Sequence, residues 1–170
     1  DTGMVLERLS AVLQGKRTNF DTDLFMPIIK TVEGISGKKY GIANETDVSM
    51  RVIADHIRTA AFVLSEGLFP SNEGRGYVLR RIIRRAARHG CMLGIKDPFL
   101  YNALDTVYKI MSEPYPELLE NTDRSKNVLK LEEERFAHTL TSGMEILNRL
   151  MDELRSSGSD TIPGPELFKL

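Results

Sequence analysis

The sequence predicts an all-α fold, a helical bundle of about five to seven helices with one long helix near the C-terminus. Apolar residues recur at every third or fourth position along most of the chain. No segment combines sustained polar–apolar alternation with β-branched residues, as a half-buried strand would. A hydrophobic content of 41% over 170 residues gives enough apolar surface for a core without disulfides or metals.

The first two predicted helices lie in the N-terminal quarter of the chain. The first is expected to stop at Gly15, because glycine readily ends a helix. The second is expected to begin after a capping side chain, Asp21 or Thr22, and to end at Gly34 and Gly37. The apolar residues of the first are Met4, Val5, Leu6, Leu9, Val12 and Leu13.

Two longer helices are predicted in the middle of the chain. The third follows Asn44–Asp47, a segment rich in capping residues, and ends at Gly67. A loop, Phe69–Gly74, separates it from the fourth helix. That helix is expected over residues 75–89, with Gly90 marking its end.

The C-terminal half is predicted to hold one short and one long helix. Asp97 and Pro98 suit the cap and the first position of the fifth helix, which two later prolines end. A long helix is expected from Leu118, with an irregularity near 121–125. It should end in the Ser/Gly linker at 156–160.

Composition and the chain ends limit the setting of the protein. The 23 Lys and Arg residues against 24 Asp and Glu leave a net charge of -1, so total charge favours no partner. The single cysteine, Cys91, and the lack of a signal segment or long apolar run predict a cytoplasmic protein without a membrane partner. Cys91 and His89 lie two residues apart without further ligands nearby, so no metal site is expected. Asp1 and Leu170 are expected to be cut ends of a longer protein.

The segment between residues 75 and 89 contains arginines and no acidic residue. The arginines are Arg75, Arg80, Arg81, Arg84, Arg85 and Arg88. Five of them fall within an arc of about 140° on a helical wheel, opposite an apolar face. A solvated face normally mixes charge signs, so unpaired arginines favour an anionic partner. Their forked guanidinium groups suit phosphate oxygens.

Asn72, in the loop before these arginines, is the candidate for reading nucleotide sequence. An amide both donates and accepts hydrogen bonds, so it is able to read a base edge from the shallow minor groove of an RNA helix. The alternative is that Asn72 is a helix cap or a turn residue.

Residues Arg51–Arg58 and Phe69–Ala86 resemble the most recognisable stretch, after the catalytic motifs, of one family, the alanyl-tRNA synthetases. Asp1–Leu9 resembles its third signature motif, and residues 19–25 match its Asn-Phe-Asp-Thr-Asp-Leu-Phe stretch. Glu166–Leu170 resembles the lead into a later segment. The resemblance covers essentially the whole chain in the right order.

The resemblance implies a class II ligase that activates alanine with ATP and transfers it to the 3′ end of tRNA. Recognition would depend on a G·U wobble pair in the acceptor stem. Arg8 matches the family arginine that binds the ATP γ-phosphate. Asn72 matches the asparagine implicated in contact with the wobble pair, and the helix from Arg75 to Arg88 matches the tRNA-binding helix. Val5 replaces a family glycine next to the nucleotide.

The resemblance also implies a division into two parts. Residues 1–19 would be a remnant of the catalytic domain, and residues 20–170 a helical tRNA-binding domain. Alone, the chain is expected to be catalytically incomplete and to hold no cofactor. ATP, magnesium and an editing-domain zinc are expected for the full-length enzyme. The expected partners are the acceptor stem of tRNA(Ala) and the catalytic and editing domains of the parent chain. The family aspartate that acts with the asparagine would lie just past Leu170.

Two other functions are compatible with the same pattern. In one alternative the chain is a helical scaffold whose basic face docks an acidic protein partner. In the other, the helices only support the catalytic domain. Competition by tRNA with a changed acceptor-stem pair distinguishes the first of these from RNA recognition. A purely supporting part would have no affinity for tRNA.

Overall fold

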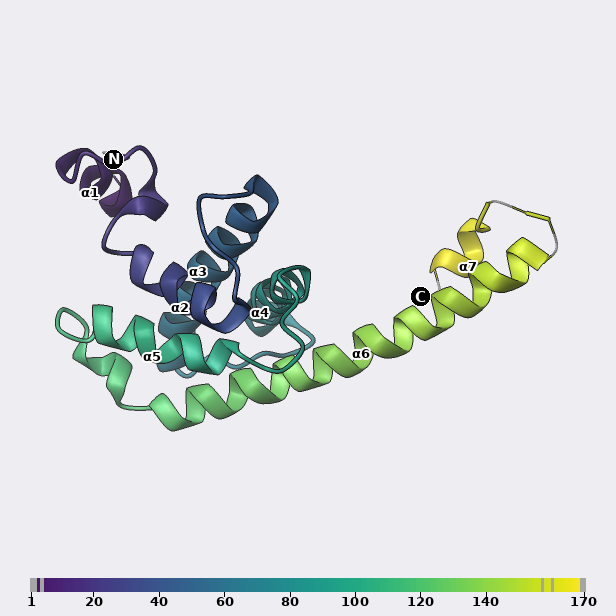
Figure 1. Cartoon of the computed structure of the whole chain (residues 1–170). Helices are drawn as coiled ribbons and strands as arrows, with labels where there is room; N and C mark the ends of the chain where they lie inside the picture. The colour runs from purple at the N-terminus through teal and green to yellow at the C-terminus, as the bar shows by residue number, and fades with distance from the viewer. Residues whose placement is uncertain (1–2, 4, 157, 160, 169–170) are drawn as a thin grey trace. The chain divides into compact units, whose positions relative to one another are not determined.

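A computed structural model describes residues 3, 5–156, 158–159 and 161–168, and these residues form helices, turns and loops without a strand. The prediction of an all-α fold with one long C-terminal helix is confirmed. The elements, drawn in Figure 1, are α1 (Leu6–Leu13), η1 (Asn19–Asp21), α2 (Met26–Ser36), α3 (Asn44–Ser65), α4 (Gly74–Met92), α5 (Leu100–Met111), η2 (Pro116–Leu119), α6 (Thr122–Ser156) and α7 (Gly164–Phe168).

The chain divides into two compact units, residues 1–133 and 134–170. The second unit contains the part of α6 from residue 134 onward and the whole of α7. Its described side chains are mostly exposed. The boundary expected after residue 19, between a catalytic remnant and an RNA-binding part, stays a prediction. No helix in the described part of the chain is both long and apolar enough to cross a membrane.

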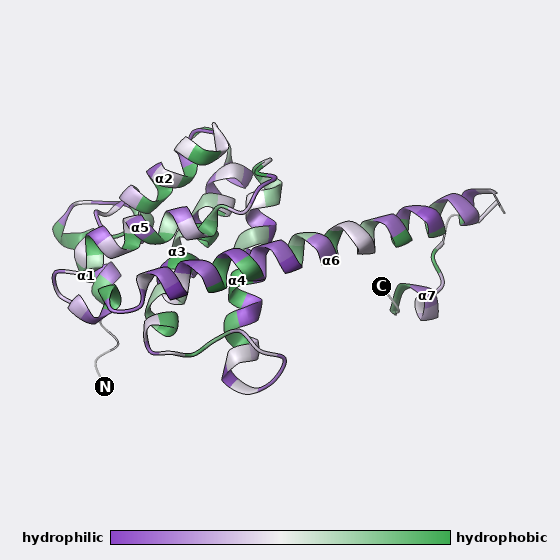
Figure 2. Ribbon diagram, turned by 90° about the horizontal axis from the view of Figure 1, so that it is seen from below, coloured by the Kyte–Doolittle hydropathy of each residue, from purple (hydrophilic) through white to green (hydrophobic). Residues whose placement is uncertain are grey.

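Helix α3 lies at the centre of the first unit, where it contacts α2, α4 and α5. Its buried residues recur at helical spacing and are at most 1% exposed: Met50, Ile53, Ala54, Ile57, Ala60, Ala61 and Leu64. Helix α4 contributes Leu79, Ile83 and two alanines to the same core. In Figure 2, hydrophobic and hydrophilic bands alternate along α4, because its other face consists of arginines.

The predicted start of α2 is wrong by about one turn. Asn19–Asp21 forms a 3-10 turn, and the Thr22 hydroxyl donates a hydrogen bond to the Asn19 carbonyl at 2.6 Å. That hydroxyl is therefore used inside the turn and caps no helix, so α2 begins only at Met26. The predicted end at Gly37 is confirmed, with φ at 68°, whereas Gly34 lies inside the helix.

Helix α4 continues past Gly90, which the sequence predicted as its end. A Cβ atom at Gly90 would lie 2.3 Å from the Phe99 ring, and that ring is 4% exposed. Glycine is present here because the ring packs directly against the helix backbone. The helix ends at Met92, and Gly94 follows it with φ at 89°.

Gly90→Ala is expected to lower the free energy of unfolding by about 1–3 kcal/mol, because the buried Phe99 ring must move to admit a methyl group. Gly34→Ala is the matched control, since nothing lies within 4 Å of a Cβ at that position in α2. The control should raise stability by about 0.5–1 kcal/mol through helix propensity alone. Urea unfolding followed by circular dichroism measures both. Equal stabilisation by the two alanines would contradict the packing of Phe99 on Gly90.

Helix α5 begins two residues later than predicted, at Leu100, because its cap comes from a distant segment. The Glu133 carboxylate on α6 accepts hydrogen bonds from the backbone N–H groups of Phe99, at 3.2 Å, and Leu100, at 2.9 Å. Glu133 is 4% exposed, so this buried carboxylate replaces Asp97 as the cap. The irregularity expected within 121–125 is a break before the long helix: η2 ends at Leu119, and α6 starts as a regular helix at Thr122.

Candidate nucleic-acid interface

The loop before α4 is held against the first turn of that helix. The Ser71 hydroxyl donates to the Glu73 carbonyl at 2.7 Å. Gly76 is buried, and a Cβ there would lie 2.5 Å from the Phe69 carbonyl oxygen. Only glycine allows the loop to approach the helix this closely. Glu73, the N-cap residue directly before this helix, makes no capping hydrogen bond through its side chain.

Asn72 lies exposed in this loop and does not cap the helix. Its Oδ1 accepts a hydrogen bond from Nη1 of Arg80, about two turns along α4. Arg80 engages one of the two lone pairs of this oxygen and so orients the amide, whose donor is the Nδ2 amino group. Among the described residues, Nδ2 has no hydrogen-bond acceptor. The structure therefore gives no support to Asn72 as a helix cap, whereas the other alternative, a turn residue, agrees with its position in a bend of the loop.

Two of the six arginines are paired with a carboxylate from α6, so the expectation of an entirely unpaired arginine face is wrong. Nε of Arg84 lies 2.8 Å from Oε1 of Glu132, and Nε of Arg80 lies 3.1 Å from the same oxygen. The Glu132 side chain is 3% exposed, whereas those of Arg80 and Arg84 are 16% and 32% exposed. These two arginines balance a buried charge that belongs to the protein itself.

The sequence reasoning missed Glu132, although a signal for it was present. Leu129 is fully buried, and Glu132 and Glu133 follow it at the spacing of the same helix face. Carboxylates on the buried face of a helix need partners, since an unpaired buried charge is costly. Glu132 pairs with two arginines of α4, and Glu133 accepts a hydrogen bond from a backbone N–H group at the start of α5.

The other arginines of α4 remain exposed. Arg81, Arg85 and Arg88, which we call the arginine stripe, follow one another at intervals of four and three and so share one helix face. Arg75 is exposed in the first turn of the helix. Within the described residues, none of these four makes an ion pair with a carboxylate. Arg81 lies over the half-exposed Tyr77 ring, 5.9 Å from its centroid. The stripe is thus a free cationic surface of the kind that binds phosphates.

His89 follows this stripe on α4, and the charges of the stripe affect the pKa of its imidazole. Its Nδ1 atom is 3.1 Å from the Ser49 hydroxyl. Burial, and then the positive charges of Arg85 and Arg88, lower the pKa of His89 below the usual value for histidine. The lowered pKa favours the neutral form of the imidazole.

Comparison with known proteins assigns this arrangement to a family. All 170 residues match the family described as tRNA synthetases class II (A). The chain belongs to the alanyl-tRNA synthetase family. Proteins named alanine–tRNA ligase from Desulfosudis oleivorans and Pediococcus pentosaceus are 54% and 53% identical to it over 170 residues. The protein of that name from Streptococcus thermophilus is 54% identical. The chain spans 19% of the length of each of these relatives.

Asp1–Leu9, which is expected to match the third motif of the family, overlaps the start of α1, with Val5 directly before that helix. The Arg8 side chain is exposed, and among the described residues it makes no hydrogen bond or ion pair. Val5, in place of the family glycine, has φ at -84°, which any residue adopts, so the exchange strains no backbone. Met4, expected in this helix, lies outside the described residues. In the described part of the chain, no group of three or more His, Cys, Asp or Glu side chains is placed to hold a metal ion.

Glu7, next to Arg8, attaches α1 to α3. Its carboxylate pairs with the guanidinium of Arg58, which also lies 4.1 Å from the centroid of the Phe25 ring. Burial favours a higher pKa for Glu7, but hydrogen bonds from its own backbone N–H and from Arg58 lower the pKa overall. Asp55, three residues before Arg58 on α3, lies 2.9 Å from the His56 ring nitrogen.

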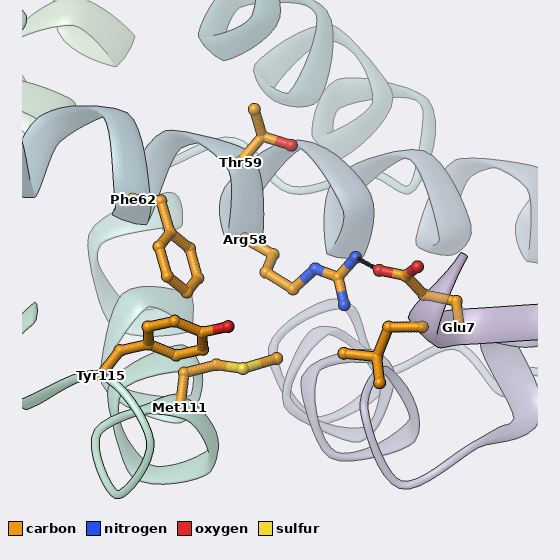
Figure 3. A pocket seen from close by; sticks show the side chains of 7 residues that line it. Glu7, Arg58, Thr59, Phe62, Met111 and Tyr115 are labelled. Carbon is orange, nitrogen blue, oxygen red and sulfur yellow. Dashed lines mark hydrogen bonds and ion pairs between the residues drawn. The ribbon is translucent and has the colours of Figure 1, made fainter. Parts of the chain in front are cut away.

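Figure 3 shows the open pocket beside this ion pair, with a volume of about 250 Å³. It is lined by Leu6, Glu7, Arg58, Thr59, Phe62, Met111 and Tyr115. The charged groups at its wall satisfy each other, and the Phe62 and Tyr115 rings pack edge to face, with centroids 5.1 Å apart. We therefore regard the pocket as a seam between α1, α3 and α5 and not as a ligand site. Arg8 lies on α1, and the arginine stripe lies on α4.

Proposed function

We propose that this chain is the acceptor-stem-binding part of an alanine–tRNA ligase, which joins alanine to tRNA(Ala) using ATP. The observation that carries the proposal is the placement of an outward-facing amide, Asn72, at the start of a helix whose exposed face is the arginine stripe. Phosphate contacts supply affinity and set the register, while contacts with base edges supply specificity. The two kinds of group lie on one loop and helix.

We assign the phosphate contacts and the base contact to different side chains, according to which polar groups have no hydrogen-bond or ion-pair partner in the part of the chain that the structure describes. Arg75 and the arginine stripe hold backbone phosphates, because they are exposed and have no carboxylate partner among the described residues. The Asn72 Nδ2 group donates to an acceptor atom in the minor groove of the stem, such as the O2 atom of a pyrimidine. Arg80 and Arg84, which Glu132 engages, are not assigned to phosphate.

The adenylation chemistry belongs to parts of the ligase other than this chain. We propose Arg8 for the γ-phosphate of ATP, on the basis of its motif and its exposed position. One exposed arginine does not form a nucleotide site, and no group of three or more described His, Cys, Asp or Glu side chains is placed to hold a magnesium ion. The remaining proposed partners are the catalytic and editing domains of the ligase. Translation takes place in the cytoplasm, which is the proposed location.

A competition experiment with the complete synthetase tests the proposal. We expect tRNA(Ala) with its G·U pair to displace labelled tRNA(Ala) roughly 5- to 150-fold better than a transcript in which that pair is G·C, equivalent to about 1–3 kcal/mol. An acidic polypeptide of similar charge should compete poorly. Equal competition by the two transcripts would refute acceptor-stem recognition. Strong competition by the polypeptide would instead favour a docking surface for an acidic protein.

A further inference from the structure

Glu132 is a buried carboxylate whose position needs a reason. Its side chain is 3% exposed, and taking a charged carboxylate out of water costs several kcal/mol unless partners compensate for it. Here two guanidinium groups from neighbouring turns of α4 meet one oxygen, Oε1, at 3.1 and 2.8 Å. An apolar residue would fill the same space at lower cost. The arrangement therefore favours a role in placing the arginines.

Arg80 joins this carboxylate to the loop that carries Asn72. Nε lies at ion-pair distance from Oε1, without the alignment of a hydrogen bond, and Nη2 donates to Oε2 at 3.4 Å. The remaining terminal nitrogen, Nη1, donates to Oδ1 of Asn72. The guanidinium is planar, so holding two of its nitrogens on Glu132 also fixes the direction of the third. Arg84 binds Oε1 from the next turn and so resists rotation of the carboxylate.

We propose that Glu132 and Arg80 are positioning residues that make the Asn72 amide donate, and not accept, hydrogen bonds at the base pair. A freely rotating amide offers either its oxygen or its nitrogen, and so would satisfy a base acceptor or the 2-amino group of guanine equally well. With Oδ1 engaged by Arg80, the Nδ2 group is presented. Arg80 thus serves specificity, whereas the exposed Arg81 one residue later serves affinity. This inference rests on the proposed function of Asn72.

Arg80→Lys in the complete synthetase tests the inference, because lysine keeps the positive charge and loses the planar fork. We expect the preference for G·U over G·C stems, measured as the ratio of kcat/KM values, to fall roughly fivefold or more. The salt dependence of tRNA binding should stay unchanged, since the charge stays. In the variant that also carries Asn72→Ala, no further loss is expected, because both changes remove the same contact. Glu132→Gln should lower the ratio in the same direction.

Arg81→Lys, on the same helix, is the matched comparison. It should shift the affinity for both stems by the same factor and leave their ratio unchanged. Alanine-dependent ATP–pyrophosphate exchange, which needs no tRNA, checks that each variant is folded. If Glu132→Gln fails that check, Arg80→Lys alone decides the outcome.

The outcomes separate this inference from the function on which it rests. If Asn72→Ala lowers the ratio and Arg80→Lys does not, the positioning role is wrong and the proposed recognition function stands. If Asn72→Ala leaves the ratio unchanged, the recognition function itself fails. If Arg80→Gln lowers the salt slope as much as Arg81→Gln does, Arg80 contacts phosphate and is not a positioning residue.

Discussion

Replacing Asn72 with alanine in the complete synthetase is expected to reduce the preference for a G·U over a G·C acceptor stem by about 1–3 kcal/mol, or roughly 5- to 150-fold in kcat/KM. The free Nδ2 group is the only donor of the side chain, and alanine removes it. Thermal stability should change little, because the side chain caps no helix and is exposed. Aminoacylation of the two transcripts, together with a melting curve of the same preparation, provides both readouts.

Asn102→Ala is a suitable control, since Asn102 is an exposed asparagine on α5, away from the loop. It should alter neither the ratio nor the melting temperature appreciably. A preserved preference in Asn72→Ala would remove this residue from the recognition site.

Neutralising two members of the arginine stripe, as Arg81→Gln with Arg85→Gln, is expected to weaken binding to all tRNA sequences by the same factor. Binding releases fewer counterions when phosphate contacts are lost. The slope of log K against log salt should therefore become shallower by about 1 per contact, or about 2 for the pair. Binding measured at several salt concentrations checks this. Lys30→Gln removes an exposed charge from α2 and should leave the slope unchanged.

His89 offers an independent readout of the same contact. Phosphates bound at Arg85 and Arg88 would offset the charges that lower its pKa, so the pKa of His89 should rise when tRNA binds. By linkage, affinity should then increase as the pH falls through the pKa of His89 in the complex. An NMR titration of the imidazole with and without tRNA measures the shift. A constant pKa together with an unchanged salt slope would show that the stripe does not contact the RNA backbone.

Local patterns in the sequence were sufficient for most of the fold. The apolar spacing that predicted the central helix matches the buried face of α3, and the ends placed at Gly37 and Gly67 agree with the structure to within two residues. Those signals are local because helical periodicity and the positive φ of glycine depend on neighbours in the chain. The prediction failed at Gly90, where glycine is required by the close contact with the Phe99 ring and not by the end of the helix.

The candidate site was likewise predicted only in part. By itself the sequence determined that arginines cover one face of α4 and that Asn72 precedes them, since both follow from position along one helix. Only the tertiary structure decided which arginines are free. Glu132 reaches Arg84 across 48 residues and Arg80 across 52, and Arg80 in turn holds Asn72. Ion pairs of this kind depend on how α6 packs against α4, and no periodicity within either helix specifies that packing.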